Sequence, residues 1–153
     1  MSRITMFKVF FVLMALLSSL NALASPEVCP VPQGFSVSIQ ASKQAMDAKV
    51  FGVRKETLQK GLRSDKTREE WITNLLNEIV DEVYSDEGFL DSDIYAFYRG
   101  ELCFVNSQVK DKIISIDFNQ ARPLLLDCEK SEEKPICAMK VVHQLTGIPL
   151  EEK

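Results

Sequence analysis

The chain has 153 residues with 18 basic and 22 acidic side chains, which gives a formal net charge of −4 at pH 7. An acidic chain repels nucleic acid and anionic lipid surfaces on average, and no dense basic run stands out, so both classes of partner are disfavoured. At this length we expect a single domain that buries roughly two thirds of the surface of its unfolded chain.

Residues 1–24 are predicted to be a secretory signal peptide. A positively charged start precedes an apolar run of 12 residues, whereas a membrane-spanning helix needs about 20, so a retained anchor is the weaker alternative. Residues 22–24, Ala-Leu-Ala, match a signal peptidase site and place cleavage before Ser25. We therefore expect a mature domain of residues 25–153 with a formal charge of −6, which is periplasmic or secreted and has no membrane anchor.

Four cysteines, all in the predicted mature part, are expected to form two disulfides, because an even number of cysteines is typical of small exported proteins. Three pairings are possible. We favour Cys128 with Cys137, since that loop is short and contains Pro135, and this leaves Cys29 with Cys103. The alternative of a thiolate metal site lacks the usual CxxC spacing.

Apolar residues recur with helical spacing over much of the chain, so the predicted fold is a small, mainly helical domain. The expected helices lie near 36–51, 54–61, 67–85, 92–105 and 135–146.

Several residues mark the ends of these helices. Thr67 and Glu70 have the spacing of a capping box, which predicts that the third helix begins at Thr67. Gly61 is expected to end the second helix. Pro135 suits the first turn of the last helix, and Gly147 is typical of its end.

An α+β fold is the alternative. Residues 113–118 and 124–126 look more like short strands than helices, and Arg99-Gly100 could turn a hairpin. Short strands would then lie within residues 95–126.

The first predicted helix carries two apolar stripes on nearly opposite faces, so it needs two neighbours. The second stripe consists of Ile39, Met46 and Val50. Burial of this helix on both sides is the simpler explanation. Alternatively, the second stripe binds a partner protein or a second copy of the chain.

Residues 29–103 combine Cys29 soon after the predicted signal, a helix ending at 51–53, a helix ending at 83–84 and an aromatic segment closing on Cys103. This pattern resembles small exported helical proteins of Gram-negative bacteria. The resemblance implies a helical fold and periplasmic residence, and it carries no activity with it. Residues 104–153, with their own cysteine pair, depart from the pattern.

The chain lacks recognisable catalytic or cofactor motifs. His143 is its one histidine, and no nucleophile motif or phosphate-binding glycine loop accompanies it. We therefore expect neither an enzyme nor a bound cofactor.

We expect a protein-binding function, such as an inhibitor or immunity factor for an enzyme, because an acidic disulfide-bonded scaffold suits masking a basic partner. A homodimer is also compatible with the sequence. The alternative function is carriage of a metal or small ligand through Met139 and His143, whose spacing places a thioether beside an imidazole, although two ligands are too few for a site.

Overall fold

The computed structural model describes residues 29–85, 88, 90–109 and 112–150. The predicted signal peptide, residues 1–24, lies outside these described residues. Within the described part, no helix combines the length and the apolar character that a membrane span requires.

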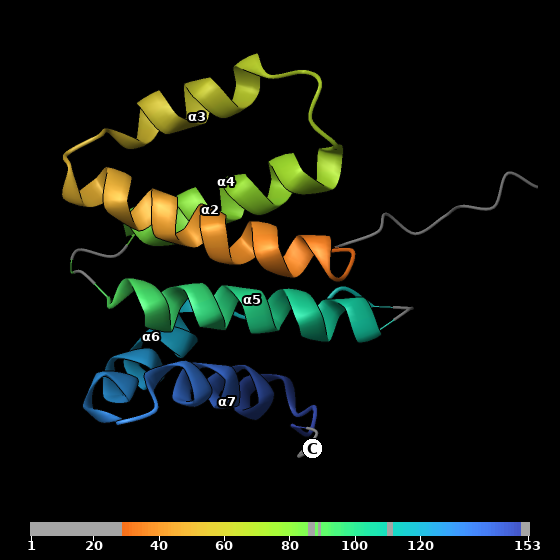
Figure 1. Ribbon diagram of the computed structural model, residues 1–153, viewed down its shortest axis with the longest axis vertical. Coiled ribbons are helices and arrows are strands. Elements are labelled where there is room, and N and C mark those ends of the chain that lie inside the picture. The colour runs from red at the N-terminus through yellow and green to blue at the C-terminus, as the bar shows by residue number, and fades with distance from the viewer. Residues whose placement is uncertain (1–28, 86–87, 89, 110–111, 151–153) are drawn as a thin grey trace, which may run out of the picture.

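The described chain is all-helical, with six α-helices and one short 3-10 helix, labelled as in Figure 1. They are α2 (Gln33–Val50), α3 (Lys55–Ser64), α4 (Glu70–Ser85), α5 (Ser92–Gln108), α6 (Phe118–Asp127), η1 (Cys128–Lys130) and α7 (Lys134–Thr146). The predicted helical class is confirmed, and all five predicted helices are present.

Helix α5 lies at the centre of the fold (Figure 1). It packs against α2 on one side and against α7 on the other. Helix α4 contacts α2, α3 contacts α4, and α6 contacts α7. Most residues of α5 are buried, so this helix is enclosed by its neighbours rather than exposed along one face.

The apolar face predicted for α4 forms part of the core, with Leu75, Ile79 and Val83 buried. The start of this helix differs from the prediction, because it begins at Glu70 rather than at Thr67. The Thr67 hydroxyl donates a hydrogen bond of 2.7 Å to Asp65 Oδ1 instead of capping the helix. Local hydrogen bonding by a threonine therefore competes with helix capping here.

Two glycines lie inside helices, although one was expected to end a helix and the other to form part of a hairpin turn. Helix α3 continues past Gly61 to Ser64. Helix α5 continues through Gly100, so the hairpin alternative is wrong. A Cβ atom at Gly100 would lie 3.0 Å from Ile39 Cγ1, which shows that glycine allows α2 and α5 to approach closely.

The predicted end of α7 is confirmed. Gly147 has a φ of 72°, and its N–H donates a hydrogen bond of 2.9 Å to the His143 carbonyl oxygen. This left-handed conformation favours glycine because it has no Cβ atom.

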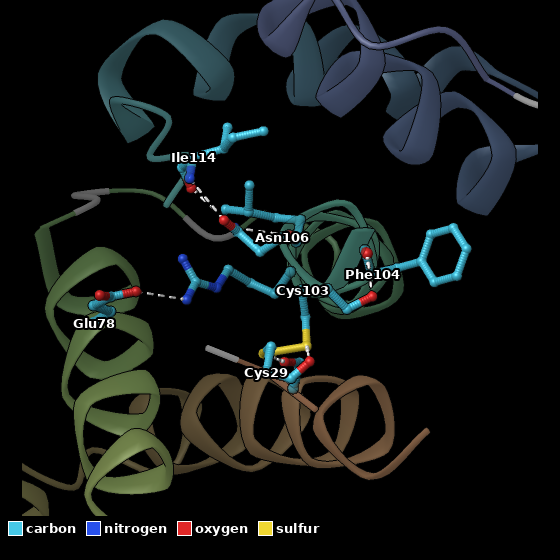
Figure 2. Close-up of a disulfide and its surroundings, with 10 residues drawn as sticks. Cys29, Glu78, Cys103, Phe104, Asn106 and Ile114 are labelled. Atoms are coloured by element: carbon cyan, nitrogen blue, oxygen red, sulfur yellow. Dashed lines mark hydrogen bonds and ion pairs between the residues drawn. A yellow bond between two sulfur atoms is a disulfide. The ribbon is translucent and has the colours of Figure 1, made fainter. Parts of the chain in front are cut away.

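The α+β alternative is wrong, because the described residues contain no strand. Residues 124–126 belong to α6, and residues 112–117 are extended without a neighbouring strand. The Asn106 side chain makes the backbone hydrogen bonds that a neighbouring strand would otherwise make. Its Oδ1 accepts from the Ile114 N–H at 2.7 Å, and its Nδ2 donates to the Ile114 carbonyl oxygen at 2.9 Å. Figure 2 shows Asn106 facing Ile114.

Both predicted disulfides form. Cys29 pairs with Cys103 across a Cα–Cα distance of 5.3 Å, and Cys128 pairs with Cys137 across 5.6 Å. The first bond joins the chain just before α2 to the middle of α5 (Figure 2). The second closes the short connection between α6 and α7. Two such bonds are consistent with an oxidising compartment outside the cytoplasm.

Two glycine-to-alanine substitutions should change stability in opposite directions. A Cβ atom at Gly34 would lie 2.8 Å from the Cys29 backbone, so Gly34→Ala should lower the free energy of unfolding by about 1–3 kcal/mol. A Cβ atom at Gly61 would meet no atom within 4 Å, so Gly61→Ala should raise the free energy of unfolding by about 0.4–1 kcal/mol. Urea denaturation measures both values. A Gly34→Ala variant that is as stable as the wild type, or more stable, would contradict the packing described at Gly34.

Replacing each cysteine pair by alanine should show which disulfide stabilises the fold more. Cys29 and Cys103 are 74 residues apart, and this loop closure is worth about 4 kcal/mol in the chain-entropy model. Cys128 and Cys137 are nine residues apart, which corresponds to about 3 kcal/mol. We expect the variant without the long-loop disulfide to unfold at the lower urea concentration. The reverse order would contradict the chain-entropy account for this protein.

Candidate functional site

A cleft of about 290 Å³ opens between α4, α5 and the extended segment 112–117. Helix α4 contributes three carboxylates to it, from Glu78, Asp81 and Glu82. Apolar side chains line the opposite wall, among them Ile113, which is 58% exposed. The Cys29–Cys103 disulfide also lines the cleft. The cleft therefore joins an acidic wall to an apolar one.

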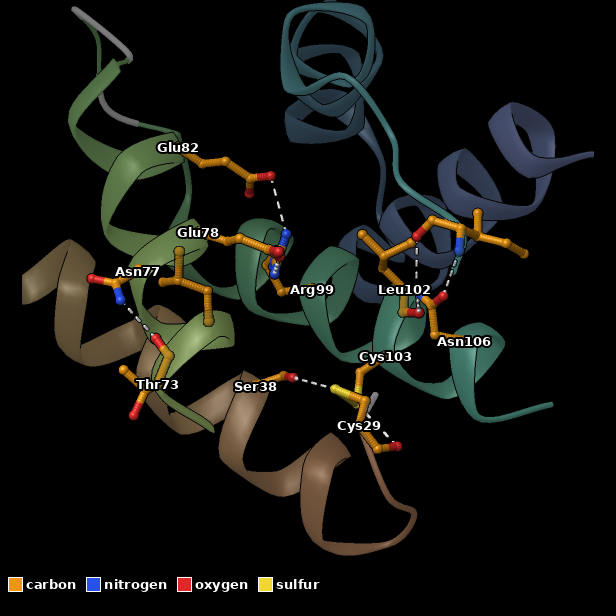
Figure 3. A network of polar contacts seen from close by, with 12 residues as sticks. Cys29, Ser38, Thr73, Asn77, Glu78, Glu82, Arg99, Leu102, Cys103 and Asn106 are labelled. Carbon is orange, nitrogen blue, oxygen red and sulfur yellow. Dashed lines mark hydrogen bonds and ion pairs between the residues drawn. A yellow bond between two sulfur atoms is a disulfide. The ribbon is translucent and has the colours of Figure 1, made fainter. Parts of the chain in front are cut away.

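Arg99 is a residue of α5 whose side chain reaches α4, and it is only 4% exposed. Its Nη2 donates to Glu78 Oε2 and its Nη1 donates to Glu82 Oε1, both at 3.0 Å. The two glutamates are four residues apart, so they occupy one face of α4 and can hold the same guanidinium group (Figure 3). Because Glu78 is 66% exposed, one end of this network reaches the solvent.

Tyr95 extends the network into the core. Its hydroxyl donates a hydrogen bond of 2.8 Å to Glu82 Oε2. Burial raises the pKa of the Tyr95 hydroxyl well above its usual value, so Tyr95 keeps its proton and remains a donor. Burial also raises the pKa of the Glu82 carboxyl, an effect that the nearby charge of Arg99 opposes. Glu82 therefore depends on Arg99 and Tyr95 to remain charged.

Asp81 lies at the edge of the cleft and is already bound by α3. Lys55 Nζ lies 2.8 Å from Asp81 Oδ1, and Gln59 Nε2 donates to the same oxygen at 3.1 Å. With Lys55 and Arg99 counted as positive, the three carboxylates leave the cleft with one excess negative charge. The cleft is therefore suited to a cationic group.

The second buried charged cluster joins α5 to α7. His143 Nε2 lies 2.7 Å from Glu101 Oε1, and Nδ1 lies 2.8 Å from the Ile148 carbonyl oxygen. A carbonyl oxygen only accepts, so Nδ1 carries a proton. Both ring nitrogens are thus engaged, and a metal ion could bind His143 only after one of these hydrogen bonds was broken.

The structure places the other predicted site residues apart from the cleft. Met139 is half-buried on α7. Among the described residues, no three side chains of His, Cys, Asp or Glu are grouped so that they could hold a metal ion. Of the proposed partner-binding stripe, Met46 is buried, Ile39 is half-buried beside Gly100, and Val50 is 64% exposed.

Apart from the two disulfide cysteines, the residues that line the cleft were not predicted as site residues from the sequence. From the sequence, Glu78 is only one residue of the predicted helix 67–85, and Arg99 is only part of a possible hairpin turn. A lone arginine in a largely apolar helix, with two glutamates spaced by four residues on a neighbouring helix, is the signal that could have indicated a buried ion pair.

No protein-family model, curated protein or solved structure matches this chain. The candidate site therefore rests on its geometry, and the resemblance of residues 29–103 to small exported proteins stays a prediction.

Removing the buried cation of Arg99 should lower the free energy of unfolding by an amount that depends on pH. Arg99→Met leaves Glu82 mostly buried without its cation, so the free energy of unfolding should fall by about 3–5 kcal/mol at neutral pH. Burial already raises the pKa of Glu82, and the loss of Arg99 raises this pKa further. As the pH falls, Glu82 in the folded variant binds a proton at a pH where it is still unprotonated in the unfolded chain. The free energy of unfolding that the variant has lost relative to the wild type should therefore become smaller.

Urea denaturation at neutral and mildly acidic pH measures this deficit. Lys130→Met is the matched control, because Lys130 forms an exposed pair with Asp127 and its loss should leave the unfolding midpoint in urea nearly unchanged. A deficit for Arg99→Met that is the same at both pH values would contradict the role assigned to Glu82.

Proposed function

We propose that this protein binds another protein in the periplasm or outside the cell, and that the cleft between α4 and α5 receives a lysine or arginine side chain of that partner. The observation that carries this proposal is the pairing of an acidic wall, which includes the exposed Glu78, with the apolar wall that includes Ile113. The predicted signal peptide and the two disulfides support a location outside the cytoplasm.

The chemistry of the two walls suits a long basic side chain. A lysine or arginine has an aliphatic stem that packs on apolar surface and a charged end that binds a carboxylate. In the cleft, the stem would lie along Leu102 and Ile113 while the charged end reached Glu78. The attraction would also speed the encounter with a basic partner surface, which is the effect expected of an inhibitor or immunity-type protein.

The size of the cleft favours a protein partner over a free small molecule. Pockets that enclose small ligands commonly have volumes of about 300–1,000 Å³. At about 290 Å³, and open to solvent on the side of Glu78, this cleft is at the lower limit of that range. It can hold one side chain of a partner whose remaining surface contacts the rim.

A photoreactive amino acid at position 113 tests the proposal. In an oxidised periplasmic extract or culture medium, irradiation should yield one adduct of defined mass, because Ile113 is exposed at the rim of the cleft. Glu78→Gln in the same chain should reduce the adduct by about fivefold, which corresponds to ~1 kcal/mol for one exposed charge pair. Raised ionic strength should also reduce it, since salt screens exposed charges.

Position 136 on α7 is the control, because Ile136 is exposed and lies outside the cleft. Equal adducts at positions 113 and 136, or an adduct at position 113 that Glu78→Gln leaves unchanged, would reject the cleft as the binding site. An adduct of twice the mass of the chain would identify the partner as a second copy.

A further inference from the structure

Charge is distributed unevenly along this chain. Residues 54–68 contain six basic and two acidic side chains, a formal charge of +4, although the predicted mature domain as a whole carries −6. The rest of that domain therefore carries −10. The net charge of the whole chain is unfavourable for binding anionic partners, but it does not describe the region around α3.

Most of this positive charge is exposed on α3 and on the residues that flank it. Helix α3 contacts α4 and contains no buried residue. Lys55 faces α4, where it pairs with Asp81. Four other basic residues of this region are exposed and form no ion pair within the described part of the chain: Arg54, Lys60, Arg63 and Lys66.

Two exposed apolar side chains precede these cations in the chain. Phe51 is 83% exposed and Val50 is 64% exposed, at the turn that leads from α2 into α3. The turn is held in place, because the Tyr84 hydroxyl donates a hydrogen bond of 2.6 Å to the Val53 carbonyl oxygen. Lys49, the residue before Val50, donates a hydrogen bond of 2.8 Å from its Nζ to the Val83 carbonyl oxygen. The phenyl ring is therefore presented to the solvent from a fixed backbone.

We propose that this surface, here called the α3 edge, binds the surface of an anionic lipid bilayer. The α3 edge consists of Val50, Phe51, Arg54, Lys60, Arg63 and Lys66. Its cations would contact headgroup phosphates, and its two apolar side chains would enter the boundary between headgroups and acyl chains. The acidic remainder of the molecule would be repelled by the same bilayer, so the α3 edge would face the membrane.

The apolar residues favour a bilayer over a nucleic acid. A phenyl ring can stack on a base, but a valine gains nothing comparable from bases. Both side chains lose contact with water when they enter the acyl boundary. Helix α3 has ten residues and is about 15 Å long, so the cations on it and at its two ends can lie over several headgroups at once.

Vesicle co-sedimentation tests the proposal with the oxidised protein of residues 25–153. We expect binding to vesicles made of equal parts phosphatidylglycerol and phosphatidylcholine, and little binding to pure phosphatidylcholine. Lys60→Glu combined with Arg63→Glu should weaken binding by more than about tenfold. Phe51→Ser should weaken it by about tenfold through the loss of buried apolar surface. Both sites are exposed, so unfolding by urea should be unchanged within error.

Two substitutions on α7 are matched controls. Lys140→Glu removes an exposed cation and Ile136→Ser removes an exposed apolar side chain, and neither lies in the α3 edge. Both should bind vesicles like the wild type. Equal binding to neutral and anionic vesicles, or wild-type binding by the Lys60/Arg63 double variant, would overturn the proposal. Binding of a single-stranded oligonucleotide that is tighter than vesicle binding and insensitive to Phe51→Ser would assign the α3 edge to nucleic acid instead.

Discussion

Buried charged side chains constrain how neighbouring helices pack, and α5 carries two of them. Arg99 and Glu101 are two residues apart, so they project from nearly opposite faces of the helix. Arg99 meets Glu78 and Glu82 on α4, while Glu101 meets His143 on α7. An unpaired buried charge costs several kcal/mol, whereas apolar packing tolerates small rotations of a helix. We infer that the two charged clusters set how α4 and α7 are turned toward α5.

The candidate cleft follows from this arrangement. Turning α4 so that Glu78 and Glu82 reach Arg99 places Asp81 at the cleft edge, where Lys55 of α3 binds it. The edge of the acidic cleft is thus joined to helix α3 through one ion pair, between Lys55 and Asp81. The net charge of −4 is a sum over the whole chain, so it describes neither the acidic cleft nor the basic α3 edge.

The sequence-based errors have local physical causes. Gly61 was expected to end α3, but an exposed glycine inside a helix costs only about 1 kcal/mol, and the helix continues. Residues 113–118 alternate like a strand, yet the side-chain amide of Asn106 satisfies the backbone of Ile114 without a partner strand. Helix α6 was missed because Pro123 and a short run of leucines favour other structures when only neighbouring residues are considered.

From the sequence alone we predicted the helical class, against an α+β alternative, the end of α7 at Gly147, and the disulfide pairing as the favoured one of three. These features depend on periodicity, on loop length and on the conformational freedom of one residue, all of which can be recognised over short stretches of chain. Only the tertiary structure decided that Arg99, Glu78 and Ile113 line one cleft and that Phe51 is exposed at the turn before α3. Those residues are distant in sequence or belong to ambiguous patterns. Their chemistry depends on burial and proximity, which exist only once the helices have packed.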